Sequence, residues 1–554
     1  MPPSGRISPA PNDSEKRETR ESVASTEDPP TEHDDHYLTG MRLFLTSMGM
    51  LMSVLLVALD QTIVSTALPT IASKFNAFNK VTWIATGYFV TQGGLMLSYG
   101  QLLSIASTKW VYLVAIVLFE IGSLFCAVAP NVEFLIFGRV VAGMGGAGIF
   151  VSVLSIIAQV SRLEKRPMLL GTFGAIFGLS SVVGPLLGGA FTDHVSWRWC
   201  FYINLPLGAI TVLVIISLIP ERAPLSSVEY EGKTTMQKWI SLDWTGSILT
   251  LVTITSLMLP LQWGGNERPW DDKVIIALFC VCGVLFPTLI FWEWRLGGRG
   301  ILPTALFRRS SVGVFLSTVG FLASVASFMS TYYFPIYFQV AKGHSATHSG
   351  IDMLPYILSL ICTSVGSGGI IGFTGQYWPF LFCSPLLISV SSGLLYTLDK
   401  NSGRGEEIGY QILFGVGIGG GLQTTLIAIQ AEYAKEEELI PQASSLVSFL
   451  RLIGGLIGIA ISGTILANEF NKFLALYAPE LPHEVALAVR RNVAIIFTLP
   501  PEQQGPVVRA YLDALKRVFL IGVPTGACAA LSVLLIKNYN LKARGVKPGS
   551  SGAT

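Results

Sequence analysis

The chain has 554 residues, of which 51% are hydrophobic and only 13% are charged, and its formal net charge is +2. A soluble domain carries nearer 25% charged residues, so this composition excludes an ordinary soluble fold. The small net charge also gives no basis for a nucleic-acid partner. Long apolar runs separate short clusters of charge and do not alternate as barrel strands do. The sequence therefore predicts an all-α integral membrane protein.

Residues 1–40 contain many Pro, Ser, Glu and Asp residues and few large apolar ones, so we expect a disordered, cytoplasmic N-terminal tail. After it, hydropathy predicts about fourteen membrane spans, each near the ~20 residues that a bilayer requires. They form groups of about six, two and six. The spans begin near Leu43, Val81, Trp110, Phe134, Leu169 and Phe201, then Leu242 and Val274, then Val312, Ile351, Trp378, Ile408, Ser445 and Val518.

This grouping predicts two six-helix bundles joined by a linker with two inserted spans, an arrangement typical of secondary transporters. The assigned segments are an N-terminal bundle at 41–220, the linker at 221–300, a C-terminal bundle at 301–536 and a cytoplasmic tail at 537–554. Lys and Arg are about twice as frequent in one set of short loops as in the other, which predicts cytoplasmic termini. The long loop at 468–517 is then extracellular, and its His483–Phe497 stretch is predicted to be an amphipathic helix.

The seven cysteines are scattered, and an odd number cannot all pair within the chain. Cys280 and Cys282 lie in an apolar run without a neighbouring His or acid, so their spacing does not predict a metal site. The sequence contains no phosphate-binding loop, no nucleophile elbow and no repeated pore loop. These observations argue against an ATPase, a membrane enzyme and a channel.

Asp60 lies inside the apolar stretch Leu43–Leu68, which is long enough to cross a bilayer. A carboxylate at that depth is unfavourable unless it faces a polar cavity or a partner, so it marks a functional site by default. Gln61 follows it and extends the polar turn. The alternative is a structural acid held by a neighbouring helix.

Arg139 lies ~9 Å below the outer end of its span, and Asp60 lies ~12 Å below the outer end of the first span. Their similar depth predicts that the two charges can approach each other, and an acid beside an arginine is what proton coupling needs. A static ion pair is the alternative. Glu120 lies ~15 Å from either end of its span. It is either a second proton carrier or a protonated residue that is hydrogen-bonded within the bundle.

The fifth predicted span contains Gly184, Pro185, Gly188 and Gly189. Gly184 and Gly188 are four residues apart, so they share a face that a neighbouring helix can approach closely. Pro185 predicts a kink. The segment is interpreted as a hinge or seal for alternating access, and a tight contact without a gating role is the alternative.

Several amide and aromatic side chains are candidates to line a central substrate cavity, because a large apolar ligand needs only a few polar contacts. They are Gln61, Tyr88, Gln92, Tyr333, Tyr337, Gln339, Gln423 and Gln430. Any one of them can instead bridge two helices. Arg451 is predicted to lie only ~9 Å inside the cytoplasmic end of its span, so we expect its side chain to snorkel to the membrane surface.

Five segments together resemble the fourteen-span drug–proton antiporters of the major facilitator superfamily, and in particular fungal-type exporters. The first span contains LDQTIVSTALPTIA (59–72), which resembles their first-helix signature, and the fourth contains GRVVAGMGGAG (138–148), an Arg followed by glycines. GPLLGG (184–189) resembles the antiporter signature of the exporters. The likeness is completed by WRWCFYINLPLG (197–208) and YYFPIYFQVAKGHSATHSGIDMLP (332–355).

The resemblance implies the major facilitator fold and a proton-coupled efflux antiporter that exports drugs, toxins or secondary metabolites by alternating access. It implies no enzymatic activity and no cofactor apart from the proton gradient. The partners are then the lipid bilayer, protons and a small-molecule substrate, and we expect a functional monomer. The implied location is the plasma membrane, with the vacuolar membrane as the alternative. A siderophore or nutrient transporter on the same scaffold is the alternative function.

The loop between the second and third spans departs from the superfamily pattern G-x-L-x-D-x-x-G-R-K. It keeps the Gly, the Leu and the final Lys of the pattern, but it lacks the Asp, the second Gly and the Arg. The retained residues are Gly100, Leu102 and Lys109, and the substituted ones are Ser104, Ser107 and Thr108. We therefore expect the cytoplasmic latch that these charges usually form to be weak or to be replaced by hydrogen bonds.

Overall fold

Long apolar helices build the part of the chain that the computed structural model describes. This part comprises residues 37–75, 80–221, 234–264, 268–309, 312–482, 485, 489 and 493–545. Within it, the only pairing of the β type is two isolated bridges. The predicted N-terminal tail falls almost wholly outside the described residues, as does the end of the C-terminal tail.

The first half of the chain forms six spanning elements, the last of which is α7 followed by α8. Its helices are α2 (Gly40–Phe75), α3 (Val81–Ile105), α4 (Thr108–Val128), α5 (Val132–Val160), α6 (Arg166–His194), α7 (Trp199–Tyr202) and α8 (Asn204–Leu218). Helix-capping residues in the sequence agree with the observed ends of these helices. The side chain of Asn131 caps α5 by accepting a hydrogen bond of 2.8 Å from the backbone N–H of Phe134.

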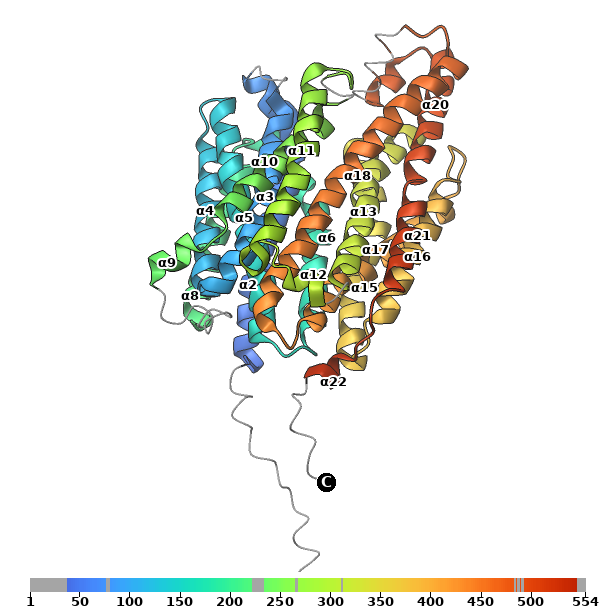
Figure 1. Ribbon diagram of the computed structural model, residues 1–554. Helices are drawn as coiled ribbons and strands as arrows, with labels where there is room; N and C mark the ends of the chain where they lie inside the picture. The colour runs from blue at the N-terminus through green and yellow to red at the C-terminus, as the bar shows by residue number, and fades with distance from the viewer. Residues whose placement is uncertain are drawn as a thin grey trace, which may run out of the picture. The chain divides into compact units, whose positions relative to one another are not determined.

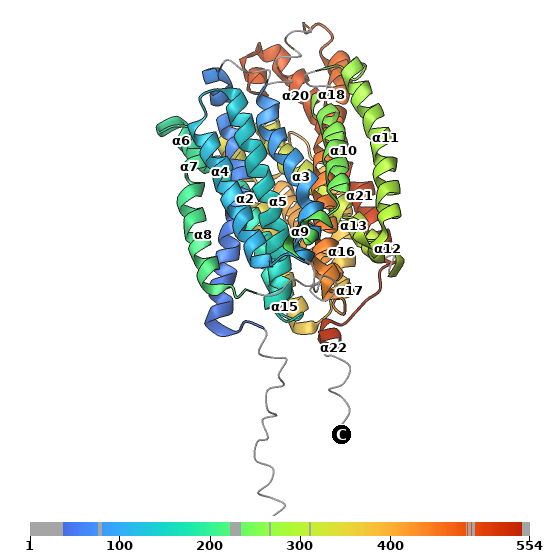
Figure 2. The same cartoon turned by 60° about the vertical axis from the view of Figure 1, so that its left-hand side comes forward.

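The inserted pair follows a short amphipathic helix, α9 (Thr235–Ile240), and consists of α10 (Trp244–Trp263) and α11 (Lys273–Leu296). Asp243 and Asp272 cap α10 and α11 through their carboxylates. α10 packs against both α3 and α11. Only 6% of the most apolar 18-residue stretch of α11 is buried inside the protein. Most of this helix therefore presents the apolar surface that contact with lipid requires. Figure 2 shows α11 at the edge of the bundle, outside α10.

The second half repeats the six-element pattern. After the one-turn 3-10 helix η3 (Gly297–Arg299), its helices are α12 (Ala305–Arg309), α13 (Val312–Lys342), α14 (Ala346–Asp352), α15 (Leu354–Thr374), α16 (Trp378–Leu395), α17 (Arg404–Glu432), α18 (Ile440–Tyr477), α20 (Pro501–Phe519) and α21 (Gly522–Val533). A short helix, α22 (Leu541–Gly545), follows. Its core is aromatic, with Phe334, Tyr356 and Phe414 in mutual contact.

Thirteen of the described helical segments are long and apolar enough to cross a membrane. α3 is also long enough, with 25 residues, but it carries Gln, Thr and Ser side chains that lower its hydropathy. It packs inside the bundle against α5 and α18. With α3 added to these thirteen, the helices match the predicted number of about fourteen spans, and the all-α membrane fold is confirmed.

The loop predicted at 468–517 is shorter than expected. α18 continues to Tyr477, and α20 begins at Pro501 and leads into α21. α20 packs on α18 and α13 and buries Val507, Tyr511 and Leu515. α20 carries charged residues on its other face, and the predicted last span corresponds to the end of α20 and the apolar helix α21. Most of the helix predicted at His483–Phe497 lies outside the described residues.

The two halves meet along two pairs of helices, α6 with α15 and α3 with α18. Gly171, near the start of α6, approaches the backbone of Ser364, and Gly100, near the end of α3, approaches Ser445. Both contacts lie at the end of the bundle where α2 begins and α22 lies, whereas α20 lies at the opposite end (Figure 1). The halves are therefore in close contact at the end where α2 begins and α22 lies.

Candidate functional site

Asp60 on α2 and Arg139 on α5 form a buried ion pair, as their predicted depths imply. Arg139 Nη1 lies 2.6 Å from Asp60 Oδ2, and the side chains are 2% and 0% exposed. Arg139 Nε also donates a hydrogen bond of 3.0 Å to the backbone carbonyl of Ile84. A buried pair of this kind is strongly disturbed when one partner is removed, because the other charge is then left uncompensated.

Tyr88 and Asn204 complete the surroundings of this pair. The ring centroid of Tyr88 is 4.5 Å from the guanidinium carbon of Arg139, within the range of a cation–π contact. Asn204 Nδ2 lies 3.5 Å from Asp60 Oδ1 and donates a hydrogen bond of 3.1 Å to Ser123 Oγ. Sequence reasoning missed Asn204, although a buried amide inside WRWCFYINLPLG was an available signal.

Glu120 does not join the Asp60–Arg139 pair directly. Its carboxylate packs on Gly208 of α8, and both carboxylate oxygens are buried without a hydrogen-bond partner among the described residues. Ser123, the partner of Asn204, lies one helical turn from Glu120. Asn204 therefore links Asp60 on α2 to Ser123 on α4, and no hydrogen bond between described residues continues from Ser123 to Glu120.

A central cavity of about 220 Å³ lies between the two halves. Its walls are mainly aromatic and aliphatic, and hydroxyl and amide groups supply most of their polar atoms. The residues that line it include Ala58, Gln61, Thr62, Phe89, Gln92, Phe150, Phe173, Phe177, Ser324, Ser327, Phe328, Tyr332, Tyr356, Gln423, Ser448 and Arg451. A concave apolar site with a few polar groups is the usual form of a small-molecule binding site.

Three of the predicted cavity residues line this cavity: Gln61, Gln92 and Gln423. Gln61 Nε2 donates a hydrogen bond of 3.2 Å to Gln92 Oε1, which joins α2 to α3 at the cavity wall. Gln423 Oε1 on α17 is buried without a hydrogen-bond partner among the described residues. An unpaired buried carbonyl of this type is available to a polar group of a ligand.

The other five predicted residues do not line the cavity. Tyr88 packs under Arg139, and Tyr333 lies in the aromatic core of the second half. Tyr337 donates hydrogen bonds to Glu407 and to the backbone of Asp399. Gln339 donates to Ser349, and Gln430 donates across the two halves to the carbonyl of Leu154 at 3.4 Å.

The error on α13 has a simple helical cause. Successive residues of a helix point about 100° apart, so Tyr332 and Tyr333 face different neighbours. The cavity face of α13 carries Ser324, Phe328 and Tyr332. Sequence reasoning recognised the polar aromatic residues of this span but had no means to know how the helix is rotated about its axis.

Arg451 also lies elsewhere than expected. α18 begins at Ile440, eleven residues before Arg451, so the arginine is ~16 Å from the start of the helix and not ~9 Å. Its side chain lines the central cavity. The predicted span began too late because the polar first turns of α18, which contain Gln442 and Ser444, were read as loop.

The antiporter segment, which means residues 184–189 of α6 that resemble the signature of the exporters, packs against α2 next to the ion pair. A Cβ atom on Gly184 would collide with the Thr62 side chain, and one on Gly188 would collide with the carbonyl of Ile63. A Cβ on Gly189 would meet only open space. Pro185 is accommodated inside the continuous helix. Gly184 and Gly188 therefore hold α6 against the polar turn of α2, whereas Gly189 does not.

Hydrogen bonds surround the connection between α3 and α4, which lacks the charges of the superfamily pattern. Gln101 Nε2 donates to the carbonyl of Arg299 at 2.8 Å, and Gln101 Oε1 accepts from the backbone N–H of Asp243 at 3.1 Å. Thr108 accepts a hydrogen bond of 2.8 Å from Gln159. Neutral hydrogen bonds thus tie the end of α3 to the inserted helix pair, in line with the second of the two expectations.

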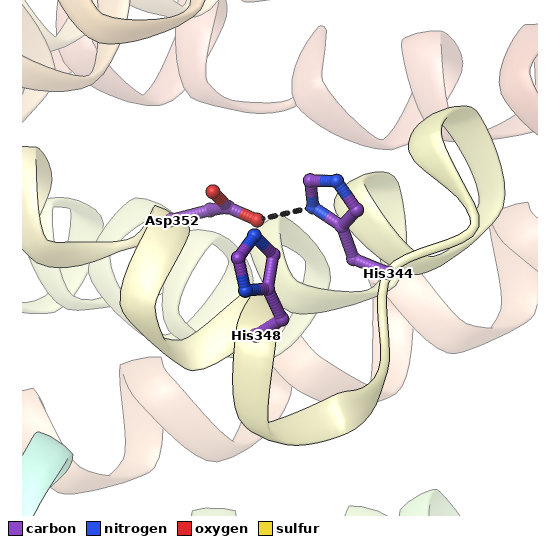
Figure 3. Close-up of side chains that lie close together, drawn as sticks. All are labelled: His344, His348 and Asp352. Carbon is purple, nitrogen blue, oxygen red and sulfur yellow. Dashed lines mark hydrogen bonds and ion pairs between the residues drawn. The ribbon is translucent and has the colours of Figure 1, made fainter.

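A cluster of His344, His348 and Asp352 lies at the junction of α13 and α14 (Figure 3). His344 Nδ1 is 2.6 Å from Asp352 Oδ2, and the two imidazole rings are 4.3 Å apart in an edge-to-face arrangement. No metal site is predicted from the sequence, although these three residues follow one another at intervals of four. None of the three residues lines the central cavity. The His344–Asp352 contact ties the end of α13 to α14.

Curated proteins of similar sequence are fungal membrane transporters. The chain is 38% identical over 519 residues to the "MFS-type efflux pump MFS1" of Trichophyton rubrum, covering 93% of this chain and 95% of that protein. It is 39% identical over 544 residues to the "MFS-type transporter astH" of Aspergillus oryzae, covering 97% and 94%. It is 36% identical over 510 residues to the "Efflux pump aunC" of Aspergillus niger, covering 92% and 88%.

Solved structures support the fold. The proton:xylose symporter XylE superimposes with a TM-score of 0.58 at 13% identity, covering 90% of this chain and 98% of that chain. The human organic anion transporter MFSD10 gives a TM-score of 0.54 at 14% identity, covering 88% and 100%. Residues 50–459 match the Major Facilitator Superfamily. With its two six-element halves and central cavity, this chain belongs to the major facilitator superfamily and is a multi-pass membrane transporter, not an enzyme.

Proposed function

We propose that this transporter exports small hydrophobic or amphipathic organic compounds in exchange for protons. Two of the relatives described above carry the name efflux pump, which supports the direction of transport. The aromatic and aliphatic walls of the cavity support a mostly apolar substrate. Import of a siderophore or nutrient is the alternative, and it requires the opposite direction of net substrate movement.

The observation that carries the proton-coupling proposal is the position of the ion pair directly behind the cavity wall. Ala58, Gln61 and Thr62 of α2 line the cavity, while Asp60 on the same turn contacts Arg139 inside the first half. Any change in the charge of Asp60 therefore acts on the helix that forms the substrate wall. The Gln61–Gln92 hydrogen bond lies on the cavity side of this region and is the proposed cover of the pair.

The proposed cycle uses the ion pair as a two-state contact. While Asp60 is ionised, its contact with Arg139 holds α2 against α5. A proton on Asp60 removes the negative charge, and Arg139 then keeps the carbonyl of Ile84 and the face of Tyr88 as partners. The weaker contact changes the relative free energies of the outward-facing and inward-facing arrangements, which is the requirement for coupling. Rocking of one half against the other is the usual motion of this architecture.

Glu120 remains the candidate for a second proton carrier. Asn204, which lies 3.5 Å from Asp60, donates a hydrogen bond to Ser123, one turn from Glu120 on the same helix. The functional unit is proposed to be a monomer, since the cavity is formed between the two halves of one chain. The plasma membrane is the proposed location, with the vacuolar membrane as the alternative.

Reconstituted protein tests the coupling. Proteoliposomes with an acidic lumen are given neutral, cationic and anionic pyrene derivatives, whose fluorescence is insensitive to pH. An antiporter concentrates its substrate in the acidic lumen, and a gradient of about two pH units supports about 100-fold accumulation per proton for an uncharged substrate. We expect wild-type protein to concentrate at least one probe above the level of protein-free liposomes, and to stop doing so when the gradient is collapsed.

Asp60→Asn is the decisive variant, because the amide has the shape of the protonated acid but releases no proton. It should bind the probe and equilibrate it down its gradient, yet fail to concentrate it. The matched control is Asp193→Asn, which removes an exposed acid from α6 and should behave as wild type. Accumulation by Asp60→Asn at the wild-type level would show that Asp60 is not the proton carrier, and the same assay on Glu120→Gln would then be the next measurement.

A further inference from the structure

Among the described residues that line the central cavity, a single side chain is cationic. Arg451 of α18 lines it together with hydroxyl, amide and apolar groups, and the residues described as lining the cavity include no Asp, Glu, Lys or His. The other arginine of interest, Arg139, is neutralised by Asp60 and is not among the lining residues. The walls of the substrate site therefore carry a net positive charge.

Arg451 has no partner of its own. Its Nη1 atom is buried, and the guanidinium makes no hydrogen bond or ion pair with any described residue. Its aliphatic stem packs beside Gly320 of α13, where the missing side chain leaves room for it. An unpaired charge at this depth is unfavourable, and such residues in membrane proteins mark substrate or ion pathways.

We propose that Arg451 is the counter-ion of the substrate, and that the transported compounds are organic anions. The acidic group is a carboxylate or another acidic oxygen, and the rest of the molecule is apolar. This inference rests on the proposed export function and specifies its substrate class. The guanidinium is suited to the task because it presents a fixed fork of donors to a carboxylate.

The surroundings of Arg451 fit this class of ligand. The hydroxyl groups of Ser324, Ser327 and Ser448 line the same cavity and can accept from or donate to a polar substituent. The aromatic residues Phe150, Phe173, Phe177 and Phe328 cover the apolar walls. A compound with one acidic end and a planar apolar body would satisfy both the unpaired guanidinium and these walls.

Binding measurements test the charge preference without a pH gradient. Purified protein in nanodiscs is titrated with three probes of one shape: 1-pyrenebutyrate (anionic), its methyl ester (neutral) and pyrenebutylammonium (cationic). Energy transfer from protein tryptophan to pyrene reports binding. We expect wild-type protein to bind the anion roughly tenfold or more tightly than the ester, the size of one charge-assisted hydrogen-bonded contact. Equal binding of acid and ester, binding of neither, or preference for the cation would overturn the proposal.

Variants assign the preference to Arg451. Arg451→Gln should bind acid and ester equally, and Arg451→Lys should keep a reduced preference because the charge remains without the fork. Lys472→Gln is the matched control, since it removes a positive charge from an exposed position of the same helix. Retention of the full anion preference by Arg451→Gln would overturn the assignment.

Thermal unfolding separates a binding role from a structural one. Without ligand, Arg451→Met should unfold at a higher temperature than wild type, because it removes an unpaired charge from the interior. Pyrenebutyrate should raise the unfolding temperature of wild-type protein but not of Arg451→Met. A structural arginine predicts the reverse: lower stability of Arg451→Met, and equal effects of the anion on both proteins.

The outcomes for this site and for the proposed function remain distinct. Gradient-driven accumulation of a pyrene probe, combined with an anion preference that does not depend on Arg451, would leave the export function standing and overturn the anion site. Anion binding that depends on Arg451, without accumulation of any probe, would support the site and overturn proton-coupled export.

Discussion

At the scale of single residues, the chemistry of this transporter is concentrated around one acid. Asp60 is held by Arg139 and approached by Asn204, and Tyr88 covers the guanidinium. Each of these contacts comes from a different helix of the first half. A change in the charge of one carboxylate therefore reaches α3, α5 and α8 as well as the cavity wall on α2.

A double-mutant cycle distinguishes a coupling pair from a static one. Arg139→Gln leaves the buried Asp60 without its charge partner, and removal of one partner from such a pair costs about 3–5 kcal/mol. The double variant Asp60→Asn/Arg139→Gln should recover part of this stability, because two neutral amides can hydrogen-bond to each other. Thermal unfolding in detergent measures the stability, and accumulation in proteoliposomes measures the coupling.

Neither Arg139→Gln nor the double variant should concentrate substrate. The exposed pair Lys80–Glu133, which also joins the start of α3 to α5, is the control cycle, and its coupling energy should be small because it is solvated. If the double variant regains gradient-driven accumulation together with stability, the Asp60–Arg139 pair is only structural.

At the scale of elements, the glycines of α6 set how close this helix lies to α2. Gly184 and Gly188 face Thr62 and Ile63 at the turn that carries Asp60. Thr62 Oγ1 adds a hydrogen bond of 2.9 Å to the carbonyl of Ser180, one turn earlier on α6. The α2–α6 contact therefore joins the antiporter segment to the proposed proton site, which is a physical basis for a role in gating.

Alanine substitutions test this contact. Gly184→Ala and Gly188→Ala each place a methyl group against α2, and overpacking of this kind costs about 1–3 kcal/mol. We expect both variants to lower the unfolding temperature and to slow gradient-driven transport. Gly189→Ala is the matched control, because its methyl group meets open space and alanine favours helix by about 1 kcal/mol. Equal losses at all three positions would contradict a specific contact with α2.

At the scale of the whole molecule, the two halves touch near the end that carries the termini of the described chain. The pairs α6–α15 and α3–α18 make this contact, and Gln430 adds a hydrogen bond between α17 and α5. If that end is cytoplasmic, as the distribution of Lys and Arg predicts, the structure represents an outward-facing arrangement. The Gln101 hydrogen bonds then hold α3 at the closed side in place of the usual charged latch.

Epitope tags test this orientation. Tags at either terminus or in the 225–238 segment should be inaccessible to antibody in intact cells, and a tag in the 479–500 segment should be accessible. Permeabilised cells provide the control, since all tags should then be labelled. Surface labelling of either terminus would contradict the predicted orientation, and absence of labelling at 479–500 in intact cells would favour the vacuolar membrane.

Some features of this protein could be predicted because they depend on one coordinate, the depth along a helix. Hydropathy yields the spans, and the rise of ~1.5 Å per residue yields the depth of Asp60 and Arg139, so their meeting was foreseeable. The shared face of Gly184 and Gly188 follows from the helical period in the same way. The fold class follows from all these spans together.

The remaining features depend on how each helix is rotated and where it begins, and neighbouring helices decide both. The rotation of α13 about its axis places Tyr337 inside the second half, where its hydroxyl group contacts Glu407, and directs Ser324 to the cavity. α18 begins before the predicted span because its polar first turns pack within the bundle, and the rotation of this helix directs Arg451 to the central cavity. The sequence by itself determined a membrane transporter with a buried acid–arginine pair. Only the tertiary structure decided which side chains face the central cavity. Hydropathy identifies the helices that can lie in lipid, but it does not show which face of each helix packs against its neighbours and which lines the cavity.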